Sequence, residues 1–135
     1  MMSQVKTYIE TNQQRLLDEL FDLLRIPSVS ANPDFHDDVF EAAQFLADRL
    51  REAGLDEVEI CPTDGYPIVY GQKIIDPTLP TVLVYGHYDV QPAEPLELWK
   101  SGPFDPTIID GKIFARGACD DKGQFYMHVK ALEIM

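Results

Sequence analysis

Residues 81–86 read TVLVYG and run directly into His87, Tyr88 and Asp89. Most of the six are apolar or β-branched, and they would be apolar on both faces of an extended chain. This pattern is typical of a strand that is buried in the middle of a sheet. In open α/β sheets, ligands gather where the strands end at their carboxyl side. The stretch therefore predicts a central strand with a functional site at its end.

The sequence on both sides of this strand predicts helices. Apolar residues recur at helical spacing over residues 5–24, and Pro27 ends that helix. A second helix is predicted over residues 37–53, with Gly54 as its C-terminal cap. The helical pattern returns at Lys122 and continues toward the end of the chain.

Shorter strands are predicted between the helices. Residues 58–61 and 67–71 are expected to be strands, and the sequence IDGK around Gly111 is expected to turn a hairpin between residues 108–109 and 113–114. The expected fold class is therefore α/β, with a mixed central sheet flanked by helices.

Charge and composition limit the function. The chain has 135 residues and a net charge of −12, which argues against nucleic acid or an anionic membrane as a partner. No apolar run is long enough to span a bilayer, and the N-terminus lacks the pattern of a secretory signal, so a cytoplasmic location is expected. Cys61 and Cys119 are expected to be reduced and buried rather than paired.

His87 and Asp89 form the first candidate site. In an extended segment their side chains project to the same side, because they are two residues apart. A neutral imidazole is a good ligand for Zn²⁺, and a carboxylate that accepts a hydrogen bond from the other ring nitrogen fixes the tautomer. The alternative is a histidine with satisfied hydrogen bonds in a surface loop.

A second acidic cluster, RGACDDKG at residues 116–123, lies between a predicted strand and the last helix. Asp120 and Asp121 are then close to a helix N-terminus, where carboxylates are stabilised. One carboxylate can bridge two cations, as two-metal hydrolases require. The alternative is that one of the two aspartates only caps the helix.

Together these stretches resemble the M20 family of metallopeptidases, especially its dipeptidase and carnosinase-like branch. The resemblance is carried by GHYDVQP at residues 86–92 and by WKSGPFDPTIIDGKIFARGACDDKG at residues 99–123. The second stretch contains the family's motif residues in order, namely Trp99, Pro103-Phe104, Asp110-Gly111 and Arg116-Gly117. A helical N-terminus that ends in IPSVS, residues 26–30, is also typical of that family.

The resemblance implies a role for each candidate residue. His87 is implied to be a ligand of one metal, Asp120 the carboxylate that bridges two metals, and Asp89 the catalytic-site carboxylate that supports His87. Asp121 matches a position that varies in the family, so a structural role is expected for it.

The resemblance also implies the chemistry of the full-length enzyme. Two divalent metal ions, most simply Zn²⁺ with Mn²⁺ or Co²⁺ as alternatives, would activate a bridging water to hydrolyse dipeptides or short peptides. The family's general base is a glutamate of a Glu-Glu pair, and this sequence contains no such pair. Residues 1–135 are therefore expected to be a truncated N-terminal part of the catalytic domain, inactive alone. The lid domain, which also makes the homodimer, and the C-terminal part of the catalytic domain are expected to be absent.

Three alternatives remain at this point. The full-length protein could be an N-acyl amino acid deacylase of the same family. It could instead be a non-catalytic metal-binding module on the same scaffold, or an α/β fragment whose acidic motifs only cap helices.

Overall fold

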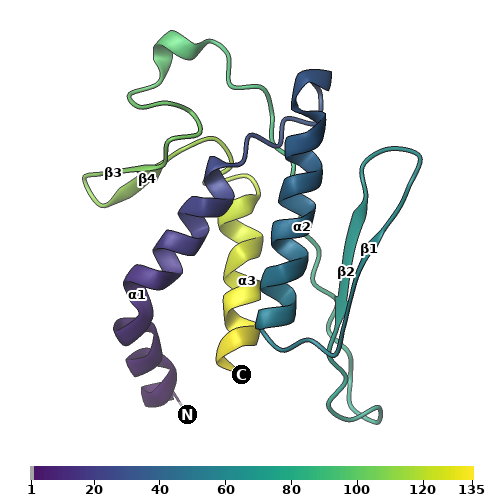
Figure 1. Ribbon diagram of the computed structural model, residues 1–135. Helices are drawn as coiled ribbons and strands as arrows, with labels where there is room; N and C mark the ends of the chain where they lie inside the picture. The colour runs from purple at the N-terminus through teal and green to yellow at the C-terminus, as the bar shows by residue number, and fades with distance from the viewer. Residues whose placement is uncertain (1) are drawn as a thin grey trace.

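The computed structural model describes residues 2–135, which form three helices and two β-hairpins (Figure 1). The elements follow in the order α1 (Met2–Arg25), η1 (Pro33–Phe35), α2 (His36–Glu52), β1 (Glu57–Cys61), β2 (Ile68–Gln72), η2 (Leu96–Leu98), β3 (Thr107–Ile109), β4 (Lys112–Phe114) and α3 (Lys122–Ile134). The predicted α/β class and all three predicted helices are confirmed.

Local sequence explains where the first two helices end. Helix α1 ends at Arg25, because the residue before Pro27 is disfavoured in the helical conformation. Helix α2 has two aspartates in its first turn and two arginines in its last turn, which complement the helix dipole at both ends. Gly54 follows α2 with a φ of +83°, a conformation that favours glycine.

The three helices enclose the core. Helix α3 lies between α1 and α2 (Figure 1). Leu23 of α1, Ala42 of α2 and the α3 residues Phe125 and Val129 are buried together in one hydrophobic cluster. Because α3 contacts both other helices, its N-terminal end is held in a fixed place beside the C-terminal end of α1.

The two hairpins form separate antiparallel sheets. Strands β1 and β2 pair from Glu57 opposite Gln72 to Cys61 opposite Ile68, and this hairpin packs against α2. Strands β3 and β4 are joined by Asp110 and Gly111, whose φ values of 50° and 73° suit the tight turn predicted for IDGK.

The prediction of a buried central strand over residues 81–86 is wrong for this structure. The segment is extended but forms no strand, and Val82 and Leu83 are 83% and 90% exposed. Within residues 2–135 no backbone hydrogen bond reaches residues 81–86. A strand needs a neighbour for its backbone groups, and the two sheets present here pair only within themselves.

A polar cluster joins α1 to the last turns of α3. Glu133 accepts hydrogen bonds from Tyr8 at 2.6 Å, from Arg15 at 2.5 Å and from Lys130 at 2.7 Å. Lys130 also donates to Glu19 of α1. Burial alone would raise the pKa of Glu133, but the hydrogen bonds from Arg15, Lys130 and Tyr8 outweigh burial and lower it to about 2.

This shift predicts an acid-dependent contribution to stability. Because the folded-state pKa lies below the unfolded-state value of 4.5, ionised Glu133 stabilises the fold above pH 4.5, and the contribution is lost as the pH falls toward 2. We expect Glu133→Gln to lower the free energy of unfolding by about 1 kcal/mol at pH 7, because solvent screens these ion pairs, and by progressively less between pH 4.5 and pH 3. Urea denaturation across this pH range measures the effect.

The matched control is Glu10→Gln, which removes an exposed carboxylate of α1 that pairs with Lys6 at 3.8 Å. It should change the free energy of unfolding by less than about 0.5 kcal/mol at every pH. A loss for Glu133→Gln that does not depend on pH would contradict the assignment of the stabilisation to the ionised carboxylate.

Candidate metal centre

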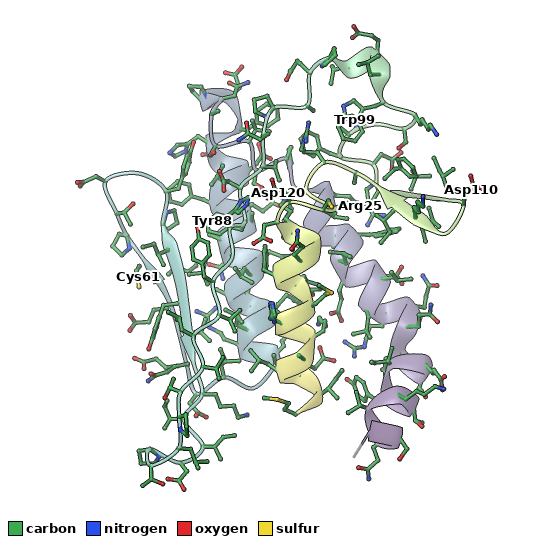
Figure 2. All side chains as sticks on the ribbon, turned by 180° about the vertical axis from the view of Figure 1, so that it is seen from behind. Arg25, Cys61, Tyr88, Trp99, Asp110 and Asp120 are labelled. Carbon is green, nitrogen blue, oxygen red and sulfur yellow. The ribbon has the colours of Figure 1, made fainter. Side chains whose placement is uncertain are left out.

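His87 and Asp120 meet although 33 residues separate them in the sequence. The Nε2 atom of His87 lies 2.9 Å from Oδ1 of Asp120. The side chain of His87 is 40% exposed and that of Asp120 is 80% exposed, so the contact is open to solvent. Figure 2 shows Asp120 at the beginning of α3.

The other ring nitrogen of His87 is held by Asp89. Its Nδ1 atom lies 3.1 Å from both the backbone oxygen and Oδ1 of Asp89. These two acceptors require a proton on Nδ1, which leaves the Nε2 lone pair of a neutral ring available for a metal. Tyr88 points elsewhere and donates its hydroxyl to the backbone oxygen of Pro67 at 2.5 Å. The alternation expected for an extended segment is therefore present.

The carboxylates control the charge of this histidine. Burial lowers the pKa of His87, but the hydrogen bonds that its ring makes to Asp120 and Asp89 outweigh burial, so the pKa is raised. Nε2 of His87 and Oδ1 of Asp120 are the two atoms that would hold a divalent cation at this position.

Backbone contacts place His87 beside the start of α3. Its backbone N–H donates to Oδ2 of Asp121 at 3.1 Å, and the peptide bond between Asp120 and Asp121 is cis. Asp121 thus binds the backbone of the histidine rather than adding an oxygen beside Nε2. Gly86 is needed for this approach, because a Cβ atom there would lie 2.5 Å from Cβ of Phe125.

Lys122, the first residue of α3, fixes the other side of the site. Its side chain is fully buried, and Nζ donates to the backbone oxygens of Leu23 at 3.0 Å and Ile26 at 2.7 Å. Burial lowers the pKa of Lys122 to about 7 against the opposing charges of Asp89 and Asp38.

Several motif residues have a structural role. The Trp99 indole donates to the backbone oxygen of Ala93 at 2.7 Å, and the Arg116 guanidinium lies 5.3 Å from the centre of the Trp99 ring. Arg116 also donates to the backbone oxygens of Pro92 at 3.0 Å and, through its backbone N–H, of Pro103 at 2.7 Å. These contacts fold the segment after Asp89 back onto the segment before Asp120.

Two serines beside the site, both in the IPSVS segment, were assigned no role from the sequence. Ser30 donates to Oδ2 of Asp89 at 2.5 Å, and Ser28 donates to the backbone oxygen of Tyr88 at 2.7 Å. They follow α1 in a segment rich in Ser, Pro and Asn, which by itself predicts only a loop. The one feature of the sequence that could have pointed to them is the spacing of two residues between their hydroxyl side chains.

The donor set fits a divalent cation, because an imidazole nitrogen and a carboxylate oxygen are both ligands of Zn²⁺. Among residues 2–135, however, no three His, Cys, Asp or Glu side chains gather closely enough to hold a metal by themselves. Cys61 and Cys119 are free, as expected, but Cys119 is exposed and Cys61 is half-buried, so the prediction that both are buried is wrong. His87 and Asp120 thus supply a pair of ligands and not a complete set.

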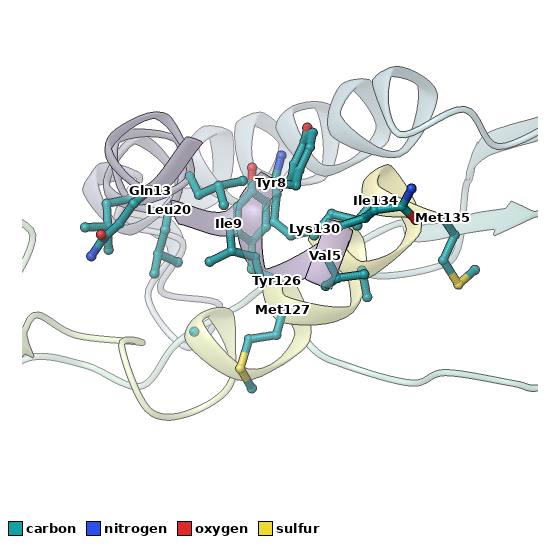
Figure 3. Close-up of a pocket in the computed structure, with 15 residues that line it drawn as sticks. Val5, Tyr8, Ile9, Gln13, Leu20, Tyr126, Met127, Lys130, Ile134 and Met135 are labelled. Carbon is teal, nitrogen blue, oxygen red and sulfur yellow. The ribbon is translucent and has the colours of Figure 1, made fainter. Parts of the chain in front are cut away.

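A separate groove lies between α1 and α3, away from His87 and Asp120. It has a volume of about 1000 Å³ and is lined mainly by apolar side chains, including Val5, Ile9 and Met127 (Figure 3). Its lining contains no His, Cys, Asp or Glu. The groove therefore offers no strong metal ligand.

The helices are also too polar or too short for a bilayer. Over the described part of the chain, no helix combines the length and the hydropathy that crossing a membrane requires.

The chain is similar to a known family profile and to several known proteins. The sequence profile of peptidase family M20/M25/M40 matches residues 83–135, which include His87, Asp89 and Asp120. A cysteinylglycine-S-conjugate dipeptidase of Corynebacterium striatum is 35% identical over 124 residues, covering 92% of this chain and 27% of the relative. The Cys-Gly metallodipeptidase dug1 of Schizosaccharomyces pombe is 35% identical over 144 residues, covering 98% of this chain and 30% of the relative.

A solved structure agrees with the fold. The crystal structure of human carnosine dipeptidase 1 superposes with a TM-score of 0.89 at 30% identity, covering 98% of this chain and 30% of that chain. The chain thus spans less than a third of the length of each of these relatives. The motifs and the matches together show that the chain belongs to peptidase family M20/M25/M40, and the relatives named above are dipeptidases.

Proposed function

We propose that residues 1–135 are the N-terminal part of the catalytic domain of a metal-dependent dipeptidase. The complete enzyme would hydrolyse dipeptides or short peptides with two divalent metal ions, most simply Zn²⁺, and would be a cytoplasmic homodimer. The observation that carries the proposal is the 2.9 Å contact between Nε2 of His87 and Oδ1 of Asp120, with Nδ1 of His87 already held by Asp89.

Each of the three residues has a distinct part in the proposal. His87 would hold one metal through Nε2, and the carboxylate of Asp120 would be shared by both metals. Asp89 holds the Nδ1 proton and keeps the imidazole in the tautomer that binds metal. Metal ions held there would supply Lewis-acid chemistry for amide hydrolysis and would activate a water as the nucleophile.

The proton of that water needs a base outside these residues. After Asp121 the only acidic residue is Glu133, which is paired with Arg15 and Lys130. Glu133 also lies about 20 Å along α3 from Asp120, given a rise of roughly 1.5 Å per helical residue. It is therefore in the wrong place to act on a water held by His87 and Asp120.

The exposed segment 81–86 supports the proposal that further chain completes the domain. It presents apolar side chains and unpaired backbone groups to solvent, and the relatives are more than three times longer than the part matched here. Strands from the remaining length would pair with this segment and give it the burial that its composition favours. In the proposed enzyme the remaining metal ligands, the general base and the lid domain also lie in that length.

The first prediction concerns metal binding in the complete protein. We expect His87→Ala and Asp120→Asn each to weaken Zn²⁺ affinity and to lower kcat/KM by at least about 100-fold, because each removes a direct ligand. Chelator competition measures the affinity. His128→Ala is the matched control, since His128 is exposed on α3 away from the site. If His87→Ala keeps its full metal content and activity, the metal centre is wrong. The alternative of a fragment whose acidic motifs only cap helices would then stand.

The second prediction concerns the substrate. The complete protein should hydrolyse unblocked dipeptides, measured by release of free amino acids, faster than N-acyl amino acids of the same side chain. Hydrolysis of N-acyl amino acids alone would replace the dipeptidase proposal with the deacylase alternative.

The third prediction concerns the missing base. The reading frame after Met135 should encode a Glu-Glu pair, and the 135-residue chain alone should be at least about 10²–10⁴-fold slower than the complete protein on the same dipeptide. A downstream frame without such a pair would favour a non-catalytic metal-binding module.

A further inference from the structure

We propose that Ser30 is a positioning residue of the metal centre, holding Asp89 in the orientation in which Asp89 holds His87. This inference rests on the proposed function and adds to it a residue that acts through Asp89 without touching the metal.

The two oxygens of Asp89 have different partners. Ser30 Oγ donates to Oδ2 at 2.5 Å, and Nδ1 of His87 lies 3.1 Å from Oδ1. A hydroxyl that donates to a carboxylate makes one of the stronger hydrogen bonds in proteins. Since the carboxylate is planar, rotating it away from the imidazole would break the bond to Ser30. The hydroxyl therefore fixes the plane of the carboxylate, and the carboxylate fixes the ring.

Ser30 is itself held in place by the backbone. The segment 28–30 runs beside residues 88–90, with a parallel bridge between Val29 and Val90 and a 2.9 Å hydrogen bond from Val90 N–H to the backbone oxygen of Ser28. Val29 and Val90 are buried, at 2% and 3% exposure. The position of Ser30 relative to Asp89 is thus set by the parallel bridge between Val29 and Val90, whose apolar side chains are buried.

Solvent access makes this restraint necessary. The side chain of Asp89 is 41% exposed, so water can compete for its oxygens. Without Ser30, the carboxylate would be free to turn toward water, and the imidazole would lose its fixed tautomer and direction. Losing such an outer partner of a metal ligand typically lowers metal affinity or activity 10–100-fold.

Ser28 provides a matched control within the same segment. It is fully buried and donates to the backbone oxygen of Tyr88 at 2.7 Å, but it does not contact Asp89. A purely structural role for the segment would make Ser28→Ala as damaging to the metal centre as Ser30→Ala. A positioning role requires that only Ser30→Ala affects it.

The experiment compares variants of the complete enzyme by Zn²⁺ affinity, measured with a competing chelator, and by kcat and KM at saturating Zn²⁺. We expect Ser30→Ala to weaken Zn²⁺ affinity 10–100-fold and Ser30→Thr, which keeps the hydroxyl, to restore it to within a few-fold. Ser28→Ala should lower thermal stability while leaving Zn²⁺ affinity unchanged. If Ser30→Ala does not fold, the near-isosteric pair Ser30→Thr and Ser30→Val gives the same comparison of hydroxyl with methyl.

The outcomes separate this inference from the proposed function. If His87→Ala weakens Zn²⁺ binding but Ser30→Ala behaves like Ser28→Ala, the metal centre stands and the role of Ser30 is wrong. Equal Zn²⁺ affinities for Ser30→Thr and Ser30→Val would also overturn it. If His87→Ala itself leaves Zn²⁺ affinity unchanged, the metal centre is wrong and the inference falls with it.

Discussion

The amino group of Lys122 binds the carbonyl groups at the end of α1, and the site depends on this contact. Removing a lysine from water is costly, and burial alone would favour its neutral form. The hydrogen bonds to the backbone oxygens of Leu23 and Ile26 offset part of that cost. These oxygens lie at the end of α1, where no further helical N–H group can bond to them, so Lys122 provides the missing donor. Both requirements are met only when the end of α1 lies against the start of α3. The packing of α1 against α3 and the placement of Asp120 therefore depend on the same contact.

Three segments that are distant in sequence converge through this contact. Residues 28–30 follow the end of α1, and Asp120 lies two residues before the start of α3. Residues 87–90 lie between them: Val90 N–H donates to the backbone oxygen of Ser28, and His87 N–H donates to Asp121. The backbone around His87 is thus held on both sides. Preformed geometry of this kind lowers the cost of ordering the ligands when a cation arrives.

The same structure leaves the segment before His87 exposed. Residues 81–86 lead directly into His87, and yet their apolar side chains face solvent. A strand with this composition is stable when both of its edges and both of its faces are covered. The three helices and two hairpins leave this segment uncovered, which is the physical basis for proposing that further chain completes the domain.

The sequence by itself determined the helices, the hairpin turn at Asp110 and Gly111, and the identity of His87, Asp89 and Asp120 as candidates. Periodicity, turn chemistry and motif spacing are properties of short segments, so they can be read without a structure. Only the tertiary structure decided the contact of Ser30 with Asp89, 59 residues away, the burial of Lys122 against α1, and the exposure of residues 81–86. These depend on which distant groups become neighbours, and a polar or apolar side chain does not specify its partner.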